Sequence, residues 1–381
     1  MDEWMTLIRR HAAKIGYTPE MLAWGFEHMF SHWNRNEMLA FLNQEIAGFR
    51  SEDLDEAVCA DTSVERRRII FPGVKYHKLL IVLASTVPSA AFQDVILSLL
   101  LPVEVMVRPA ENLLPFFEDI YIYLKKKTPK WAQRLTIVDT GHDPDALLNI
   151  LKSCDIVNVS GSSETISLYR NLIHDHHLHC DMIEHGHRLS AMVLVSDDLK
   201  RLTDEVCYNI SLDATVWEQM GCLSPKCLYI EADFVQSVDV AQRLIHCMDS
   251  LSFELPAVAS DISVRVRLNN ILSMLILDGA EVIRAHDRHH ICIVYPVGSI
   301  ADPVLLPGVL NLYPVCDAIS AAMRLKPYGQ AIGTMTPLSA ENKYMLAAAG
   351  FNYFCVFGKM QDPPLTWLHD SIGTLRPLCL E

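Results

Sequence analysis

The feature that most constrains this chain is a regular alternation of short apolar segments with helical segments, between about residues 79 and 173. Residues 79–83 are apolar at every position, which is typical of a strand buried on both faces of a sheet. Further strands are predicted at 103–107, 135–138 and 155–159, with helices at 92–100, 115–126, 145–151 and 164–173. This alternation predicts a parallel sheet with helices on both faces, which binds ligands at the carboxyl ends of its strands.

The rest of the chain predicts a helical N-terminal region and a second α/β domain. Residues 1 to about 65 carry apolar side chains at helical spacing, for example Trp4, Leu7 and Ile8. After residue 190, strands are predicted at 191–195, 227–231, 291–295 and 353–357, with helices such as 237–250 and 339–348 between them. We therefore expect an α/β fold with a helical region at 1–70, α/β domains at 71–189 and 190–365, and a C-terminal tail at 366–381.

Composition and charge argue against several classes of protein. The net charge is −14, and no basic stretch is longer than Lys125 to Lys127, which is unlike a nucleic-acid binder. The N-terminus lacks the apolar run of a secretory signal, and the longest apolar stretches, 79–87 and 95–103, are too short to span a bilayer. Eleven cysteines without a CxxC pair favour a reduced cytoplasmic protein over a disulfide framework.

A turn with the sequence Ser-Gly-Ser-Ser-Glu, residues 160–164, separates a predicted strand from a predicted helix. Gly161 permits a tight turn, and Ser162 can cap the helix. The N–H groups at the start of that helix form an anion site, which would suit the pyrophosphate of a cofactor. A single glycine is also common in ordinary turns between a strand and a helix, so both interpretations stay open.

Cys222 lies in the segment 217–225, which ends in Pro225. Because proline ends any helix before it, Cys222 is expected on a turn between a helix and the strand at 227–231. Backbone N–H groups at such a turn lower the pKa of a thiol and stabilise an oxyanion. The alternative is a buried apolar cysteine, and ten other cysteines compete for the catalytic role.

Two further groups of polar residues have weaker signals. His176, His177 and His179 lie in a segment that is rich in His and Cys but lacks the paired spacing of a zinc motif, so we expect a solvated loop without a metal. The cluster of histidines at 286–290 has the same expectation. Glu184, two residues before Gly186, is either a mobile general base or a surface acid.

Several segments together resemble the LuxC-type fatty acyl (acyl-CoA) reductases, a branch of the aldehyde dehydrogenase superfamily. The matching segments are 161–166 (GSSETI), 186–190 (GHRLS), Gln219 with 221–225 (GCLSP), 357–361 (FGKMQ) and 367–370 (WLHD). The order of Gly161, Glu184 and Cys222, and the intervals between them, are also similar to those of the superfamily. The resemblance implies an aldehyde-dehydrogenase-like fold, with a Rossmann-type domain for the cofactor and a catalytic domain that bears a nucleophilic cysteine.

The resemblance also implies an activity and a cofactor. Cys222 would attack an acyl thioester, carried by coenzyme A or an acyl carrier, and reduction by NADPH or NADH would release an aldehyde. Gly161, Ser162 and Gly186 would lie beside the cofactor. Arg108 and Glu111 match the segment that holds the adenosine ribose; Glu111 would repel a 2′-phosphate, whereas Arg108 would attract one, so the choice of cofactor stays open. An acyl-transferring partner subunit or a homo-oligomer would be in keeping with this branch.

Departures from the family pattern suggest two rival functions. Thr86 stands where the superfamily has an asparagine that binds the oxyanion, and Ala110 stands where it has a serine. A non-catalytic relative that binds acyl groups or a partner subunit would explain both changes. An enzyme that oxidises aldehydes would instead use Glu184 as its base.

Overall fold

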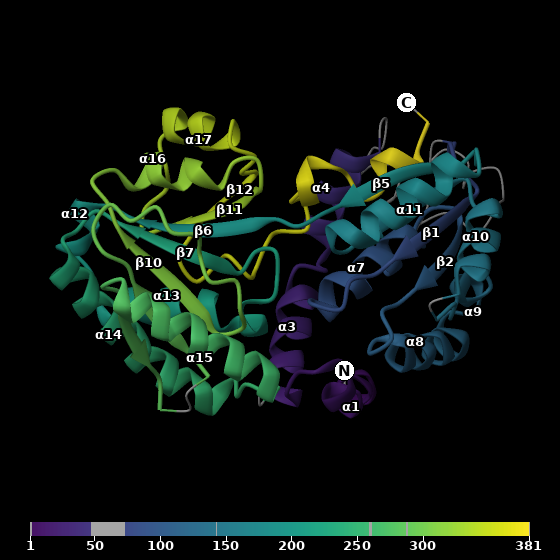
Figure 1. Cartoon of the computed structure of the whole chain (residues 1–381). Coiled ribbons are helices and arrows are strands. Elements are labelled where there is room, and N and C mark those ends of the chain that lie inside the picture. Colours follow the sequence, from purple (N-terminus) through teal and green to yellow (C-terminus); the bar gives the residue numbers. More distant parts are fainter. Residues whose placement is uncertain (1, 47–72, 142, 259–260, 287–288, 381) are drawn as a thin grey trace. The chain divides into compact units, whose positions relative to one another are not determined.

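The computed structural model describes residues 2–46, 73–141, 143–258, 261–286 and 289–380, which form two compact units with one sheet each (Figure 1). Unit 1 comprises Met1–Gly16, Leu22–His187 and Pro364–Glu381, and unit 2 comprises Tyr17–Met21 and Arg188–Pro363. The C-terminal segment thus clusters with unit 1. The helices predicted at 47–65 and the boundary predicted at residue 70 lie outside the described residues.

The sheet of unit 1 has five parallel strands in the order β3-β2-β1-β4-β5. The strands are β1 (Lys78–Val82), β2 (Glu104–Arg108), β3 (Leu135–Ile137), β4 (Ile156–Ser160) and β5 (Asp181–His185). The helices between them are α7 (Pro88–Ser98), α8 (Leu114–Lys127), α9 (Pro129–Ala132), α10 (Pro144–Lys152) and α11 (Ser163–Asp175). The parallel sheet predicted from the alternating pattern is therefore confirmed.

The central position of β1 follows from its apolar sequence. All residues of β1 after Lys78 are buried, so both faces of this strand are covered. On one face, Leu80 and Val82 pack with Leu151 of α10 and Ile166 of α11. Because β2 and β4 flank β1, the chain reverses its direction of winding between β1 and β4, and the loops after these two strands meet at the point where such sheets bind ligands.

The N-terminal helices belong mainly to unit 1. They are α1 (Asp2–Arg10), α2 (Ala12–Ile15), α3 (Pro19–Ser31) and α4 (Arg35–Glu45), as the sequence predicts for the described part of this region. Trp4 lies in an aromatic cluster with Phe26, Phe30 and Phe92, with ring centroids 4.9 to 6.4 Å from that of Trp4. The aromatic residues of this region thus pack α1 and α3 onto α7.

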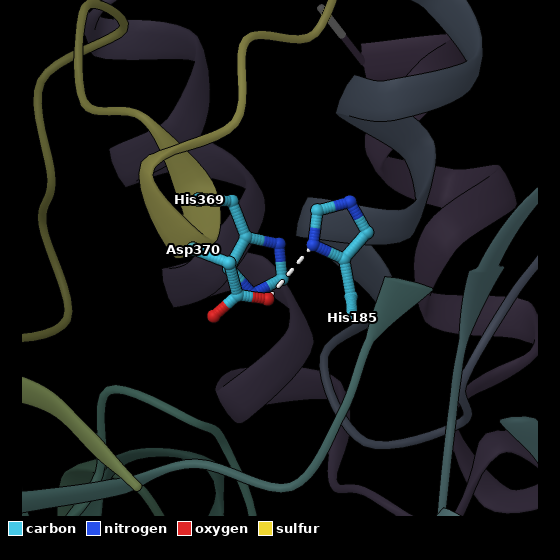
Figure 2. A group of neighbouring side chains, drawn as sticks. All are labelled: His185, His369 and Asp370. Carbon is cyan, nitrogen blue, oxygen red and sulfur yellow. Dashed lines mark hydrogen bonds and ion pairs between the residues drawn. The ribbon is translucent and has the colours of Figure 1, made fainter. Parts of the chain in front are cut away.

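The C-terminal segment is hydrogen-bonded to unit 1 at several points. Its short helical turns are η3 (His369–Ser371) and η4 (Arg376–Leu378). The carboxylate of Glu45 accepts hydrogen bonds from the backbone N–H groups of Leu375 and Arg376, both at 2.9 Å. Asp370 meets His185 at the carboxyl end of β5 (Figure 2). Residues far apart in the sequence therefore lie together at this edge of the sheet.

The sheet of unit 2 has seven strands in the order β12-β11-β6-β7-β10-β9-β8, and only β8 runs antiparallel to its neighbour. The strands are β6 (Leu189–Leu194), β7 (Pro225–Ile230), β8 (Glu281–Arg284), β9 (Ile291–Val294), β10 (Val309–Pro314), β11 (Gly329–Thr334) and β12 (Tyr353–Val356). The helices are α12 (Ser196–Leu199), α13 (Asp204–Thr215), η1 (Val216–Gln219), α14 (Phe234–Glu254), α15 (Ile262–Leu277), α16 (Ala318–Ala322), η2 (Met323–Leu325) and α17 (Ala340–Ala347). The predicted second α/β domain is confirmed.

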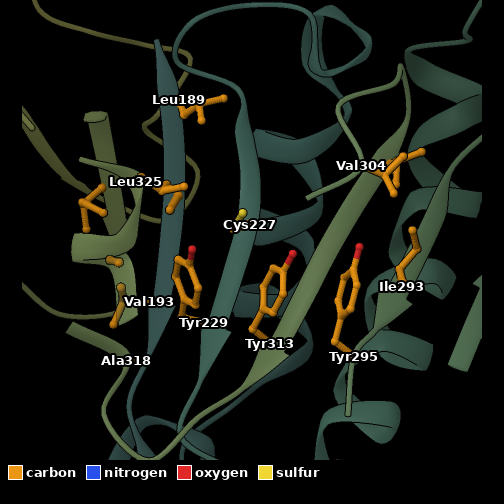
Figure 3. Close-up of a cluster of buried hydrophobic side chains, with 14 of the residues drawn as sticks. Leu189, Val193, Cys227, Tyr229, Ile293, Tyr295, Val304, Tyr313, Ala318 and Leu325 are labelled. Carbon is orange, nitrogen blue, oxygen red and sulfur yellow. The ribbon is translucent and has the colours of Figure 1, made fainter. Parts of the chain in front are cut away.

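A row of tyrosines crosses one face of this sheet (Figure 3). The rings of Tyr295 and Tyr313 stack with their centroids 4.4 Å apart, and those of Tyr229 and Tyr313 lie 5.5 Å apart. The hydroxyl of Tyr295 donates to the side-chain oxygen of the buried Asn311 at 3.0 Å, so this polar group is satisfied inside the core.

None of the helices in the described part of the chain is both long enough and apolar enough to cross a membrane.

Candidate active site

The turn at Gly161 joins the carboxyl end of β4 to the start of α11. The N–H of Gly161 donates to the carbonyl oxygen of His185, which ends the neighbouring strand β5. Ser162 caps α11, because its hydroxyl oxygen accepts from the N–H of Thr165 at 3.3 Å. A Cβ atom at residue 161 would lie 3.1 Å from Cβ of Thr165. The close approach of Thr165 therefore favours glycine at this position, whatever binds at the turn.

The start of α11 already holds one negative charge. The hydroxyl of Ser162 and the N–H of Glu164 favour the ionised carboxylate of Glu164 and keep its pKa below its usual value. An anion that binds at this helix end therefore shares it with Glu164. A helix start with a polar cap of this kind can bind an anion.

Thr86 lies at the same edge of the sheet as the Gly161 turn. It is half-buried in the bend between β1 and α7, and β1 pairs with β4 along its length. Because the two strands are parallel neighbours, the loops that follow them meet at the switch point of the sheet. The structure thus brings Thr86 to the edge where Gly161 and Ser162 lie. This edge is where a sheet of this topology holds a dinucleotide.

Arg108 is the last residue of β2, and Glu111 follows the strand at this edge. The guanidinium of Arg108 donates from Nε to the hydroxyl of Thr140 and from Nη2 to the carbonyl oxygen of Gly141, both at 2.8 Å. Glu111 is exposed in the turn before α8. Arg108 is thus held by neutral partners in the loop after β3, and its positive charge is not neutralised by these two contacts.

Glu184 is held by an arginine. Its two carboxylate oxygens accept from Nε and Nη2 of Arg170, on α11, at 3.0 and 2.5 Å. This bidentate geometry fixes the orientation of the carboxylate. Gly186 follows β5, and a Cβ atom there would lie 3.4 Å from the side chain of Ile166, within ordinary contact distance.

Cys222 lies on a turn at the amino end of β7, as the sequence predicts. The turn is preceded by Trp217, Glu218 and Gln219, whose φ angles are 58°, 48° and 59°. Three consecutive residues other than glycine in the left-handed region are uncommon, and such residues cost of order 1–3 kcal/mol each. Strained backbone of this kind is concentrated at functional sites, where the surroundings hold it in place.

Several contacts hold the strained segment in this conformation. A carboxylate oxygen of Glu218 accepts from the N–H of Val258 at 2.8 Å, and the carbonyl oxygen of Glu218 accepts from the N–H of Gly308 at 3.2 Å. The side-chain amide of Gln219 donates to the carbonyl oxygen of Pro225 at 2.8 Å, which closes the loop around Cys222. The segment around Cys222 is therefore fixed from both ends.

The segment 357–361 is also tied to the Cys222 turn. The buried carboxylate of Asp213 accepts from the N–H of Gly358 at 2.6 Å and from that of Met360 at 3.0 Å. The amide of Gln361 donates to the hydroxyl of Ser224 at 3.3 Å. Two segments that carry the family resemblance, 221–225 and 357–361, thus meet in unit 2.

Exposure separates Cys222 from most other cysteines. The structure describes ten of the eleven cysteines, all as free thiols. Burial raises the pKa of eight of them: Cys154, Cys180, Cys207, Cys227, Cys247, Cys292, Cys355 and Cys379. Cys222, Cys247 and Cys355 are half-buried, and Cys316 is exposed before the short helix α16. Because burial raises the pKa of Cys247 and Cys355, Cys222 and Cys316 are the candidates for a reactive thiol among the described cysteines.

The sequence did not foresee the cluster of His185, His369 and Asp370 in unit 1 (Figure 2). Nδ1 of His185 lies 2.8 Å from a carboxylate oxygen of Asp370, and the two imidazole rings stack with their centroids 4.4 Å apart and their planes 3° apart. A metal ion binds in the plane of each imidazole, and two stacked parallel rings do not share such a position. The geometry therefore fits an oriented histidine–aspartate pair better than a chelate.

Residues 2–380 match the model of a family described as "Acyl-CoA reductase (LuxC)". No curated protein matches the sequence.

Solved structures of aldehyde dehydrogenases share the fold at low sequence identity. A salicylaldehyde dehydrogenase from Pseudomonas putida G7, complexed with salicylaldehyde, has a TM-score of 0.64 and 13% identity, over 93% of this chain and 73% of that one. An aldehyde dehydrogenase from Mycobacterium tuberculosis, complexed with NAD+, has a TM-score of 0.63 and 14% identity over the same shares. An NAD-dependent aldehyde dehydrogenase from Burkholderia multivorans has a TM-score of 0.56 and 12% identity over 78% of this chain, which covers 59% of that protein.

Proposed function

Because this chain belongs to the acyl-CoA reductase (LuxC) family, we propose that it reduces a fatty acyl thioester to an aldehyde through an acyl group held on Cys222. The observation that carries the proposal is the position of Cys222. It is a half-buried thiol on a strained turn, in a chain whose other described thiols are mostly deeply buried. The substrate would be an acyl-CoA or an acyl-carrier thioester.

Cys222 acts as the nucleophile in this account. Its thiolate attacks the carbonyl carbon of the substrate, and collapse of the adduct expels the carrier thiolate and leaves the acyl group on sulfur. When bound, NADPH or NADH would supply the hydride that converts this thioester into the anion of a thiohemiacetal. The carbon–sulfur bond then breaks, and the aldehyde leaves as the Cys222 thiolate is restored.

Residues of unit 1 supply the cofactor site in this proposal. The switch point between β1 and β4 and the capped start of α11 support a dinucleotide there, with Gly161, Ser162 and Gly186 near its phosphates. We assign Arg108 and Glu111 to the ribose end. The partners of Arg108 are neutral, so its positive charge would attract the 2′-phosphate of NADPH, whereas the negative charge of Glu111 would repel it. The assay therefore includes both NADPH and NADH.

Thr86 is proposed as a donor to the oxyanion that forms on the substrate. Its hydroxyl supplies one hydrogen bond in place of the asparagine amide of the superfamily. Removing one such donor typically lowers the rate by about 10²–10³. Thr86→Ala should therefore lower kcat much more than it raises KM. A rise in KM with an unchanged kcat would show that Thr86 does not have this role.

A cofactor-oxidation assay tests the proposed function. The chain is mixed with a long-chain acyl-CoA and either NADPH or NADH, absorbance at 340 nm is followed, and the aldehyde is trapped with a hydrazine. Consumption of cofactor with an equal yield of aldehyde, abolished by Cys222→Ser, is the expected result. Reduction of NAD+ on addition of aldehyde without consumption in the acyl-CoA assay, or no reaction in either direction, would overturn the proposal.

A further inference from the structure

Lys226 occupies an irregular position at the start of β7. In the pairing of β6 with β7, Ser190 lies opposite Pro225 and Ala191 lies opposite Cys227, so Lys226 is the additional residue of a β-bulge. The side-chain amide of Asn311 donates a hydrogen bond to the carbonyl oxygen of Lys226 at 2.9 Å. Bulges of this kind redirect a side chain and often lie beside active sites.

The side chain of Lys226 is buried, which is unusual for lysine. The residue is 8% exposed, and burial lowers the pKa of its ammonium to about 8. No carboxylate in the described part of the chain lies within 4.0 Å of this ammonium. A charge in such surroundings is costly unless an opposite charge compensates it.

Two ionisable groups act on the ammonium, the thiols of Cys222 and Cys227, and both favour its charged form. Cys227 is fully buried, and burial raises the pKa of its thiol to about 12, so it stays protonated near neutral pH. Cys222 is half-buried. Of the two sulfurs, that of Cys222 is therefore the one nearer to solvent, where a reagent or a substrate can reach it.

We propose that Lys226 is a positioning residue that keeps Cys222 in its thiolate form by placing a buried positive charge beside the turn. The inference rests on the proposed nucleophilic role of Cys222 and adds the group that activates it. A cation next to a cysteine favours the thiolate, and the thiolate is the species that attacks a carbonyl carbon. The bulge and the bond from Asn311 hold the lysine in register with the turn.

The test is the pH dependence of alkylation of Cys222 by iodoacetamide, followed by peptide-resolved mass spectrometry in the full-length chain. Lys226→Met removes the charge but keeps a similar length, and Lys226→Arg restores the charge. Lys200→Met, at an exposed lysine paired with Asp197, is the control. We expect Lys226→Met to raise the midpoint, the pH at which Cys222 reaches half of its maximal alkylation rate, by at least one pH unit. Alkylation at pH 7 would then be about tenfold slower. Lys226→Arg and Lys200→Met should keep the native midpoint.

An unchanged midpoint in Lys226→Met would overturn the proposal. A reciprocal experiment decides the question if this variant does not fold. In Cys222→Ser the anionic partner is absent, so acetylation of Lys226 by acetic anhydride at pH 7 should become faster than in the native chain, and an equal rate would refute the pairing. Neither experiment uses acyl-CoA or a nicotinamide. Failure of the proposed reductase activity is therefore measured separately, in the cofactor-oxidation assay.

Discussion

The hydroxyl of Ser190 donates a hydrogen bond to the carbonyl oxygen of Cys222 at 2.6 Å. The hydroxyl oxygen of Ser190 in turn accepts from the N–H of Ala331 at 3.1 Å, so one buried hydroxyl connects β11, the start of β6 and the Cys222 turn. This serine is the last residue of the segment 186–190 that carries the family resemblance. The contact explains how that segment, distant in sequence, positions the cysteine.

Replacing Ser190 with alanine should weaken both the fold and the reactivity of Cys222. The carbonyl oxygen of Cys222 and the N–H of Ala331 would lose a partner, at a cost of about 1–3 kcal/mol. Ser211→Ala is a matched control, because the buried hydroxyl of Ser211 donates to Leu244 in the same unit. Denaturant unfolding should show losses in both variants, and alkylation of Cys222 should slow only in Ser190→Ala. Equal alkylation rates in the two variants would contradict the role of Ser190.

The stability of the chain should depend on pH through Asp213. Burial raises the pKa of this carboxyl to about 7, against the opposing effect of the N–H groups of Gly358 and Met360. An aspartate in the unfolded chain has a pKa near about 4, so between these values the folded state binds more protons than the unfolded state, and stability falls as pH rises. The unfolding free energy of the native chain minus that of Asp213→Asn should fall from pH 4 to pH 7, because only the native chain titrates at this position. A difference that grows over this range would show that the sign is wrong.

Ser162→Ala should lower the affinity for the cofactor as well as stability. Loss of the N-cap costs about 1 kcal/mol, because the N–H of Thr165 loses its partner. Ser339→Ala removes a cap of the same kind from α17 in unit 2, where Ser339 accepts from the N–H of Asn342 at 3.2 Å. Titration by NADPH and NADH fluorescence should show weaker binding only for Ser162→Ala. If both variants bind as the native chain does, the start of α11 is not the phosphate site.

Glu184→Gln should leave acyl reduction largely intact. Both carboxylate oxygens are held by Arg170, and reduction requires no base to activate water. Glu104→Gln, at an exposed glutamate near Lys78, serves as the control for a change of surface charge in the same sheet. The rate of cofactor oxidation with acyl-CoA is the measurement. A loss of activity confined to Glu184→Gln would show that this carboxylate takes part in the chemistry.

Much of the fold could be predicted because burial leaves a clear pattern in the sequence. The apolar run of β1 and the helices after β1, β2 and β4 lie close to their predicted positions. β5 was not predicted, since its sequence, Asp-Met-Ile-Glu-His, is largely polar, as an edge strand tolerates. β11 was also missed, because Gly329 and Gly333 interrupt it; a Cβ at either would come within 3.0 Å of a neighbouring side chain.

The candidate site was less predictable, because its contacts join distant parts of the chain. The turn that bears Cys222 could be predicted from a local pattern, because Pro225 ends any helix before it. The left-handed residues at 217–219 left no local signal, because glycine does not occur among them. Asp370 meets His185 across 185 positions of sequence, and no spacing rule reports such a pair. For Lys226, the visible signal in the sequence was a charged residue inside an otherwise apolar strand.

The most direct test of the central claim is to find the acyl group on the enzyme. The native chain is incubated with a radiolabelled long-chain acyl-CoA in the absence of NADPH and NADH, digested at low pH, and the labelled peptide is sequenced by mass spectrometry. The account predicts one acyl group, released by hydroxylamine, on Cys222, and no label in Cys222→Ser. Label on the exposed Cys316 in place of Cys222, or label that persists in Cys222→Ser, would contradict it.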